Sequence, residues 1–346
     1  MRQKAGNMSL VRYIKEIAHG ADDPRDLPEN AAYALFAAML DGGVPDIELG
    51  AILAALRMKT ESGEELLGFY RALSERTYGL HPLPGALKPL VFASYNGARH
   101  EANLLPLLVF LLQRLGIPVL LHGTLEGNGR VATVYILREL GVLPCASLAQ
   151  AQGVLDEAML AFVPTAVLAP GLAALLALRN RLGVRNTAHN LVKLLDPFHG
   201  EGVRVVSASH PAYLDKMETF FLETGFEALM LKSTDGEAFA NPRQRPRMTH
   251  VRDGNCSLLF DEEATPSRAT AGPSPGIDAP ATAAWIRQAL AGAVPIPHPL
   301  INQLACCLYA CGYTEDLNQA KAIAAVEAGG LLPSGSGGMR TRIDVR

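Results

Sequence analysis

Apolar residues recur every three or four positions through the first eighty residues, which is the spacing of amphipathic helices. Pro28 stands where a helix can begin, and Ser62 followed by Glu65 is typical of a capping box. Two of the four segments are rich in alanine, which favours close helix packing or a contact between two copies of the chain. The pattern predicts a bundle of four short helices at residues 8–20, 29–43, 47–60 and 64–79.

A proline-rich break at residues 81–89 separates this bundle from a different pattern. Beyond it, short apolar runs alternate with helical segments, which is typical of a mostly parallel sheet covered by helices on both faces. We therefore predict an α/β fold class, with a small N-terminal helical bundle before a larger α/β domain. The predicted strands are residues 90–95, 117–123, 161–164, 202–210, 227–234 and 256–261.

The same pattern predicts how the domains divide and where ligands bind. We expect a helical dimerisation domain at 1–84, joined by a returning segment around 170–190. Ligands of parallel sheets bind beyond the carboxyl ends of the strands, which singles out the loops at 94–101, 122–130 and 232–247. The α/β domain is expected at 85–169 and 191–332, and a flexible Gly/Ser-rich tail at 333–346.

Four cations gather in the mostly apolar stretch 171–197. Its first part, residues 172–182, has helical spacing and residues that favour a helix. The cations either line a site for an anion or lie on a solvated helix face with their stems along the core. They are Arg179, Arg181, Arg185 and Lys193.

Composition limits the partners that the protein can attract. The chain of 346 residues is 49% hydrophobic and carries a formal net charge of −3, so a basic binding surface must be local. Its five cysteines lack metal-ligand spacing with histidines and predict reduced thiols, which suits the cytoplasm. We expect neither a signal peptide nor a membrane span, because no long uninterrupted apolar run occurs.

The order of several short motifs resembles the anthranilate phosphoribosyltransferase family, which belongs to glycosyltransferase family 3. The motifs are LLHG followed by GNGR, AFVP followed by LGVRN, and ASHPAYLDKM. The resemblance covers residues 8–330. It implies the nucleoside phosphorylase/phosphoribosyltransferase fold, in which active members bind phosphoribosyl pyrophosphate with magnesium.

The sequence departs from this family where active members hold phosphate and metal. Residues 93–97 read Ala-Ser-Tyr-Asn-Gly where active members have a Gly-Thr-Gly-Gly-Asp pyrophosphate loop. Leu105 and Pro106 replace two hydroxyl residues, and Leu121 replaces a lysine. The acidic pair that binds magnesium is missing from 234–241. We therefore expect no catalytic residues, no metal and no cofactor, and a vestigial cleft at Asn96, Gly97, Asn103, His122 and Gly123.

Cations are kept or gained near these losses. Arg179 matches an arginine that, by the resemblance, contacts the aromatic acid in active enzymes, and Lys193 replaces part of a Gly-Pro pair. Three further arginines follow the lost acidic pair, at Arg243, Arg245 and Arg247. This combination resembles the YbiB-type branch, which implies a nucleic-acid-binding homodimer without transferase activity.

Three hypotheses follow. The first is non-sequence-specific binding of nucleic acid, DNA or RNA, by a homodimer that uses the seven cations named above on the phosphate backbone. The second is a transferase that acts on phosphoribosyl pyrophosphate with magnesium. The third is a module that binds a small anion or an aromatic acid through Arg179 and His122.

Overall fold

The computed structural model describes residues 9–19, 25–264 and 275–329, which form two compact units. The helical unit combines the chain up to Gly79 with Thr165–His199, and the α/β unit combines Leu80–Pro164 with the chain from Gly200 onward. The expected flexible tail lies outside the described residues. The returning segment is longer than the expected 170–190, because strand β3 ends at Pro164 and the chain leaves the helical core only after the buried Phe198.

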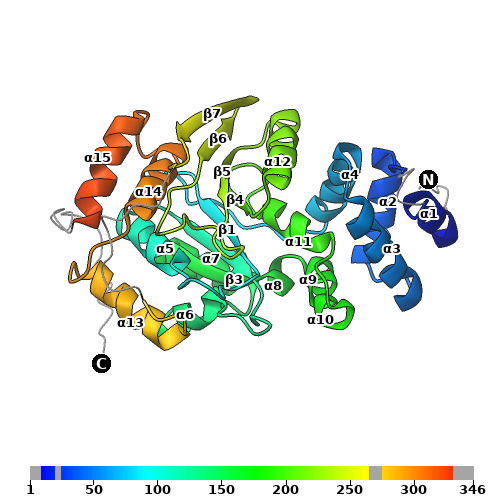
Figure 1. The fold of residues 1–346 in the computed structure, drawn as a ribbon, viewed down its shortest axis with the longest axis horizontal. Coiled ribbons are helices and arrows are strands. Elements are labelled where there is room, and N and C mark those ends of the chain that lie inside the picture. Colours follow the sequence, from blue (N-terminus) through cyan, green and yellow to red (C-terminus); the bar gives the residue numbers. More distant parts are fainter. Residues whose placement is uncertain (1–8, 20–24, 265–274, 330–346) are drawn as a thin grey trace. The chain divides into compact units, whose positions relative to one another are not determined.

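The four predicted N-terminal helices form as expected (Figure 1). The capping box at Ser62 begins the fourth helix, and the Phe36 and Phe69 rings pack with their centroids 4.9 Å apart. The four helices are α1 (Leu10–Ile17), α2 (Glu29–Leu40), α3 (Asp46–Lys59) and α4 (Gly63–Ser74).

The returning segment adds short helices to this unit. The single helix predicted at 172–182 is wrong in one respect, since it divides near Leu178 into two pieces. A tight corner and a 3₁₀ turn, Val192–Leu194, follow. The helices of the segment are α8 (Thr165–Leu168), α9 (Pro170–Ala177), α10 (Arg179–Leu182) and α11 (Ala188–Leu191).

The α/β unit is built on a seven-stranded mixed sheet with the order β3-β2-β1-β4-β5-β6-β7 (Figure 1). The first five strands are parallel, and β6 and β7 extend the sheet in antiparallel fashion. The fold class is therefore confirmed, but the sequence pattern missed β6. The strands are β1 (Leu90–Ser94), β2 (Val119–Gly123), β3 (Leu160–Pro164), β4 (Val203–Ala208), β5 (Ala228–Lys232), β6 (Met248–Arg252) and β7 (Asn255–Phe260).

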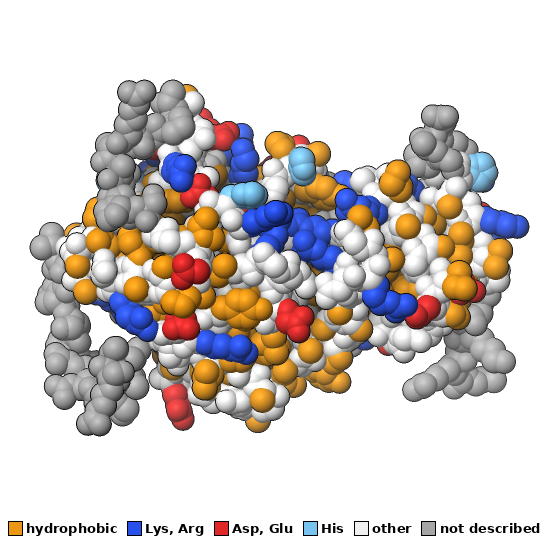
Figure 2. Space-filling model, turned by 60° about the horizontal axis from the view of Figure 1, so that its bottom comes forward, with side chains coloured by type: hydrophobic (Ala, Val, Ile, Leu, Met, Phe, Trp, Pro, Cys, Tyr) orange, Lys and Arg blue, Asp and Glu red, His pale blue; other side chains and the backbone are white. Residues whose placement is uncertain are grey.

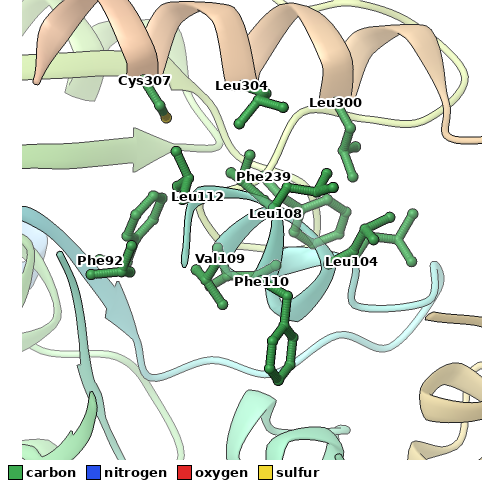
Figure 3. Packing of buried hydrophobic residues seen from close by; sticks show 14 of the residues in the cluster. Phe92, Leu104, Leu108, Val109, Phe110, Leu112, Phe239, Leu300, Leu304 and Cys307 are labelled. Atoms are coloured by element: carbon green, nitrogen blue, oxygen red, sulfur yellow. The ribbon is translucent and has the colours of Figure 1, made fainter. Parts of the chain in front are cut away.

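Helices cover both faces of the sheet. Leucines of α5 lie between the sheet and α14, beside Phe92 on one side and Leu304 and Cys307 on the other (Figure 3). Alternate residues of β4 face the opposite way, where Arg204 stacks on Phe221 of α12. The helices are α5 (Leu105–Arg114), α6 (Thr133–Glu139), α7 (Leu148–Ala158), α12 (Pro211–Thr224), α13 (Ala279–Leu290), α14 (His298–Ala310) and α15 (Leu317–Ala328). Within the described residues, none of the helices has the length and apolar character needed to span a bilayer.

A buried carboxylate fastens the start of α4 to the helices around it. Glu65 is fully buried, and it accepts hydrogen bonds from the backbone nitrogens of Leu27 (2.9 Å) and Ser62 (2.8 Å). It also pairs with the buried ammonium of Lys59 at 2.7 Å. Without Glu65 the backbone nitrogens of Leu27 and Ser62 lose their acceptor. Lys59 is then left with the exposed Asp26 as a carboxylate partner.

Replacing Glu65 with alanine should therefore destabilise the helical unit by about 3 kcal/mol, because two backbone donors lose their acceptor and Lys59 loses its buried partner. Hydrogen exchange of the α2 and α4 amides measures this loss locally, without assuming that the two units unfold together. Glu64→Ala is the matched control, because Glu64 is exposed in the same helical turn. Equal protection of the α4 amides in the two variants would contradict the prediction.

Candidate functional site

The corner between α10 and α11 positions the predicted cations of the helical unit. Asn186 holds this corner, because its Nδ2 donates to the carbonyl oxygen of Leu175 (2.8 Å) and its Oδ1 accepts from the backbone nitrogen of Ala188 (3.0 Å). The 3₁₀ turn that follows carries Lys193 between the buried Val192 and Leu194. Local hydrogen bonds, rather than a long helix, therefore set where these side chains lie.

Electrostatic effects show that Lys193 lies among other charges. Burial and the nearby Arg185 lower the pKa of Lys193 to about 8, against the opposite effect of Glu61. Burial, followed by Arg185 and Arg179, lowers the pKa of His189 to about 3, and Lys193 adds to this effect. His189 is therefore neutral at physiological pH, and the charge of this region comes from Lys and Arg.

A fourth cation joins this group from a distant part of the sequence. Arg57 of α3 donates from its Nη1 to the backbone oxygen of Arg185 at 2.9 Å. We call Arg57, Arg179, Arg185 and Lys193 the Lys193 cluster. Sequence reasoning missed Arg57, because a contact across 128 positions leaves no local signal.

A carboxylate lies next to the Lys193 cluster. Glu61 is buried, accepts a hydrogen bond from the Nδ2 of Asn190 at 3.2 Å, and raises the pKa of Lys193. Arg181, which we also predicted as a binding residue, pairs instead with Asp46 at 2.8 Å on an exposed surface. The structure therefore brings together three of the four cations of stretch 171–197.

The arginines of the loop 243–247 lie in the α/β unit, where two of them are neutralised. Arg243 pairs with Glu101 at 3.4 Å, and Arg245 pairs with Glu263 at 3.5 Å. Arg245 also lies over the Phe260 ring, 5.3 Å from its centroid, whereas Arg247 is exposed. This loop offers less net charge for a polyanion than its sequence indicates.

The surface view agrees with a local gathering of charge. Figure 2 shows Lys and Arg side chains in separate groups among larger apolar and uncharged areas. A formal net charge of −3 over the whole chain requires such an arrangement if any surface is to attract anions.

The vestigial cleft is built around a buried carboxylate of the α/β unit. Glu237 is fully buried, and its Oε1 accepts from the backbone nitrogens of Asn96 (3.0 Å) and Gly97 (2.7 Å). Its Oε2 accepts from the hydroxyl of Ser94 (2.6 Å) and lies 3.3 Å from the hydroxyl oxygen of Thr133. Asn96 and Gly97, which we predicted to line the cleft, therefore do lie together. The group that their amides bind is the Glu237 side chain rather than a ligand.

The other residues of the predicted cleft serve the fold. Asn103 is fully buried, donates to Thr133 at 2.7 Å, and accepts from the backbone nitrogen of Leu105 at the start of α5. A Cβ on Gly123 would lie 1.6 Å from the carbonyl oxygen of Ser94, so β1 and β2 need glycine there. Burial lowers the pKa of His122 to about 3. His122 is therefore neutral, which removes the cation that anion binding at this residue requires.

Comparison with known proteins supports this fold and its family. The model of the glycosyl transferase family, helical bundle domain, matches residues 11–77. The uncharacterized protein YbiB of Escherichia coli (strain K12) is 43% identical over 306 residues, which cover 88% of this chain and 95% of YbiB. An anthranilate phosphoribosyltransferase of Prochlorococcus marinus (strain MIT 9301) is 25% identical over 74% of this chain and 73% of the relative. This chain belongs to the anthranilate phosphoribosyltransferase-like family.

Solved structures extend the likeness of fold to both units. Anthranilate phosphoribosyltransferase from Thermus thermophilus matches with a TM-score of 0.75 at 23% identity, covering 94% of this chain and 96% of that one. The enzyme from Saccharomyces cerevisiae, solved in complex with PRPP and Mg, matches with a TM-score of 0.69 at 13% identity, covering 93% of each chain. At these identities the likeness establishes the fold alone.

The residues of this family member do not fit magnesium and a diphosphate. Magnesium bound to a diphosphate needs available carboxylates, whereas the Glu237 carboxylate already accepts from two backbone amides and a hydroxyl. Among the residues that the structure describes, no group of three or more His, Cys, Asp and Glu side chains could hold a metal ion. The loop after β1 also lacks amide donors at Asn96 and Gly97 for a phosphate, because Glu237 takes them.

The geometry of the Lys193 cluster predicts an unusual titration. The Lys193 ammonium should lose its proton near pH 8, well below the ordinary lysine value of about 10.4. NMR of the lysine side-chain signals measures this value. Arg185→Gln should raise the Lys193 pKa, because it removes a repelling charge, and Glu61→Gln should lower it further. A Lys193 titration at the ordinary value would contradict the burial and the charge cluster together.

Proposed function

We propose that this protein binds nucleic acid, DNA or RNA, through the phosphate backbone and without reading its sequence. In this proposal the protein acts as a cytoplasmic homodimer whose phosphoribosyltransferase cleft is degenerate. The observation that carries the proposal is the Lys193 cluster, in which Arg179, Arg185 and Lys193 all lower the pKa of His189 and Arg57 contacts Arg185. Free cysteines, of which all but Cys256 are buried, support the cytoplasmic location.

Phosphate is the ligand that best matches this cluster. Arginine presents a planar fork that can bind two phosphate oxygens, and lysine adds a compact point charge. Each phosphate that Lys or Arg neutralises releases condensed counterions, so a few grouped cations supply affinity that does not depend on sequence. Arg179, Arg185 and Lys193 are half-buried and Arg57 is exposed, so the cluster stays open to an incoming anion.

The scarcity of aromatic side chains near the predicted cations favours backbone contact over base contact. The stretch 171–197 contains no Phe, Tyr or Trp. In the loop 232–250 the sole aromatic residue is Phe239, which is fully buried and so cannot stack on a base. Stacking on aromatic rings is the usual means of holding single-stranded bases, so phosphate contacts must supply most of the affinity.

Lys193→Ala should weaken oligonucleotide binding roughly 5- to 10-fold at ~0.1 M salt, since it removes about one phosphate contact. The slope of log K against log salt should become shallower by about 0.7 to 0.9. Fluorescence anisotropy with a labelled oligonucleotide over a salt series measures both. Arg181→Ala is the matched control and should change binding little, because Arg181 is already paired with Asp46.

The lowered pKa of Lys193 predicts that the affinity for nucleic acid also depends on pH. Affinity should fall as pH rises above about 8, because Lys193 then loses the charge that phosphate needs. Lys193→Arg should keep the salt slope and lose this pH dependence, since arginine stays charged throughout the range. Binding that is undetectable at ~50 mM salt, or that does not weaken with added salt, would refute the proposed function.

An exposed apolar stripe on α3 supports the homodimer. Ile47 is 85% exposed and Met58 is 84% exposed, with the exposed Ala51 and Ala54 between them on the same helix face. Large exposed apolar side chains of this kind mark interaction surfaces.

Ala54→Arg should therefore halve the molar mass in solution, because it puts two like charges at the centre of the two-fold contact. Light scattering coupled to size-exclusion chromatography measures the mass. Ala322→Arg, which places the same change on an exposed alanine of α15, should leave a dimer intact. A wild-type protein that runs as a monomer would exclude the homodimer without excluding nucleic-acid binding.

A further inference from the structure

A tight turn after β5 carries two carboxylates toward the loop that follows β1. Thr234 and Glu237 are bridged in antiparallel fashion, and the residues between them are Asp235 with φ +53° and Gly236 with φ +92°. Positive φ at both central residues defines a type I′ turn, for which Asp-Gly is a favoured sequence. The turn therefore has a defined shape, with one acidic side chain at its first central residue and one at its end.

The Asp235 carboxylate occupies a second group of backbone amides, beside the group that Glu237 occupies. Its Oδ2 accepts from three consecutive backbone nitrogens, those of Arg99 (3.0 Å), His100 (2.6 Å) and Glu101 (3.0 Å). Successive amides that converge on one oxygen form a nest, the arrangement by which backbone binds anions. Together, the two carboxylates take five amide donors from the loop 96–101.

Further contacts fasten the turn to this loop. The Nδ2 of Asn96 donates to the carbonyl oxygen of Gly236 at 3.0 Å. The Nη1 of Arg130 donates to the carbonyl oxygens of Gly97 (3.3 Å) and Asp235 (3.1 Å) and so bridges the two segments. A Cβ on Gly236 would lie 2.5 Å from the Nδ2 of Asn96, so the close approach depends on glycine. The carboxylates are thus held in the nests by a rigid connection.

We infer that the loop after β1 is an anion-binding loop that the protein closes with its own Asp235 and Glu237. The same five amides cannot serve phosphate oxygens while the carboxylates hold them, and electrostatic repulsion between carboxylate and phosphate adds to this exclusion. The acidic side chains are equally unavailable to magnesium. This closure explains why a member of the family lacks a site for a diphosphate, and it is independent of nucleic-acid binding by the helical unit.

Asp235→Gly tests the closure at the nest that lies nearer the surface. Glycine suits the left-handed backbone of this position and leaves the amides of residues 99–101 without their acceptor. Asp235→Asn is the matched control, because asparagine also tolerates this backbone and keeps an acceptor oxygen. The probe is inorganic pyrophosphate without metal, followed through the amide NMR signals of residues 99–101.

Asp235→Gly should bind pyrophosphate at least about tenfold more tightly than the wild type or Asp235→Asn, with saturable shifts of these amide signals. Saturable shifts of the same amides in the wild type would overturn the inference. So would their absence in an Asp235→Gly protein whose other signals match the wild type.

A titration of the wild-type protein keeps the inference testable if the variant does not fold. Burial raises the pKa of Glu237 against the effect of its hydrogen bonds, whereas for Asp235 the three amide donors outweigh burial and lower the pKa. On acidification, the amide NMR signals of Asn96 and Gly97 should therefore change at a pH above the ordinary glutamate pKa. The amide signals of residues 99–101 should change at a pH below the ordinary aspartate pKa. One shared inflection for both groups, or none, would show that the carboxylates do not hold the two nests.

Discussion

Burying a carboxylate without hydrogen-bond donors costs more free energy than a fold can spare. The need to supply donors to the buried Glu237 therefore determines how the end of the sheet is built. Its oxygens collect donors from the end of β1 and from the loop that follows, and they lie near the hydroxyl of Thr133 at the start of α6. Asn103 joins the same network through Thr133 and accepts a hydrogen bond from the backbone nitrogen of Leu105, the first residue of α5. One side chain therefore connects the elements at the edge where a parallel sheet ordinarily binds its ligand.

This arrangement separates the fold of the family from its chemistry. The helices and strands of a phosphoribosyltransferase-like protein are present, and the likeness to solved enzymes spans nearly the whole chain. Yet the groups that would meet a diphosphate and its metal satisfy one another. The Lys193 cluster lies instead in the helical unit, where burial and Arg185 destabilise the charged form of Lys193. An anionic ligand of the kind we propose would stabilise this charged form.

Local patterns carried much of the prediction. Helical spacing and the capping box at Ser62 located the four N-terminal helices, and the apolar runs located six strands. The pattern failed at β6, where Pro246 and the preceding arginines make the sequence look like a loop. Pairing with β5 and β7 overrides that weak local preference, and buries His250 against Glu227 at 2.9 Å.

The candidate site shows the same contrast between what local sequence predicts and what tertiary contacts decide. The sequence by itself determined that the phosphate and metal motifs of the family are missing, because a motif is defined by the residue types at neighbouring positions of the chain. Only the tertiary structure decided what replaced them, since the partners of Glu237 lie up to 143 positions away. It also decided which cations act together, adding Arg57 to the Lys193 cluster and pairing Arg181, Arg243 and Arg245 with acids. Charges and hydrogen bonds depend on distance in space, which sequence spacing fixes only within a helix, strand or turn.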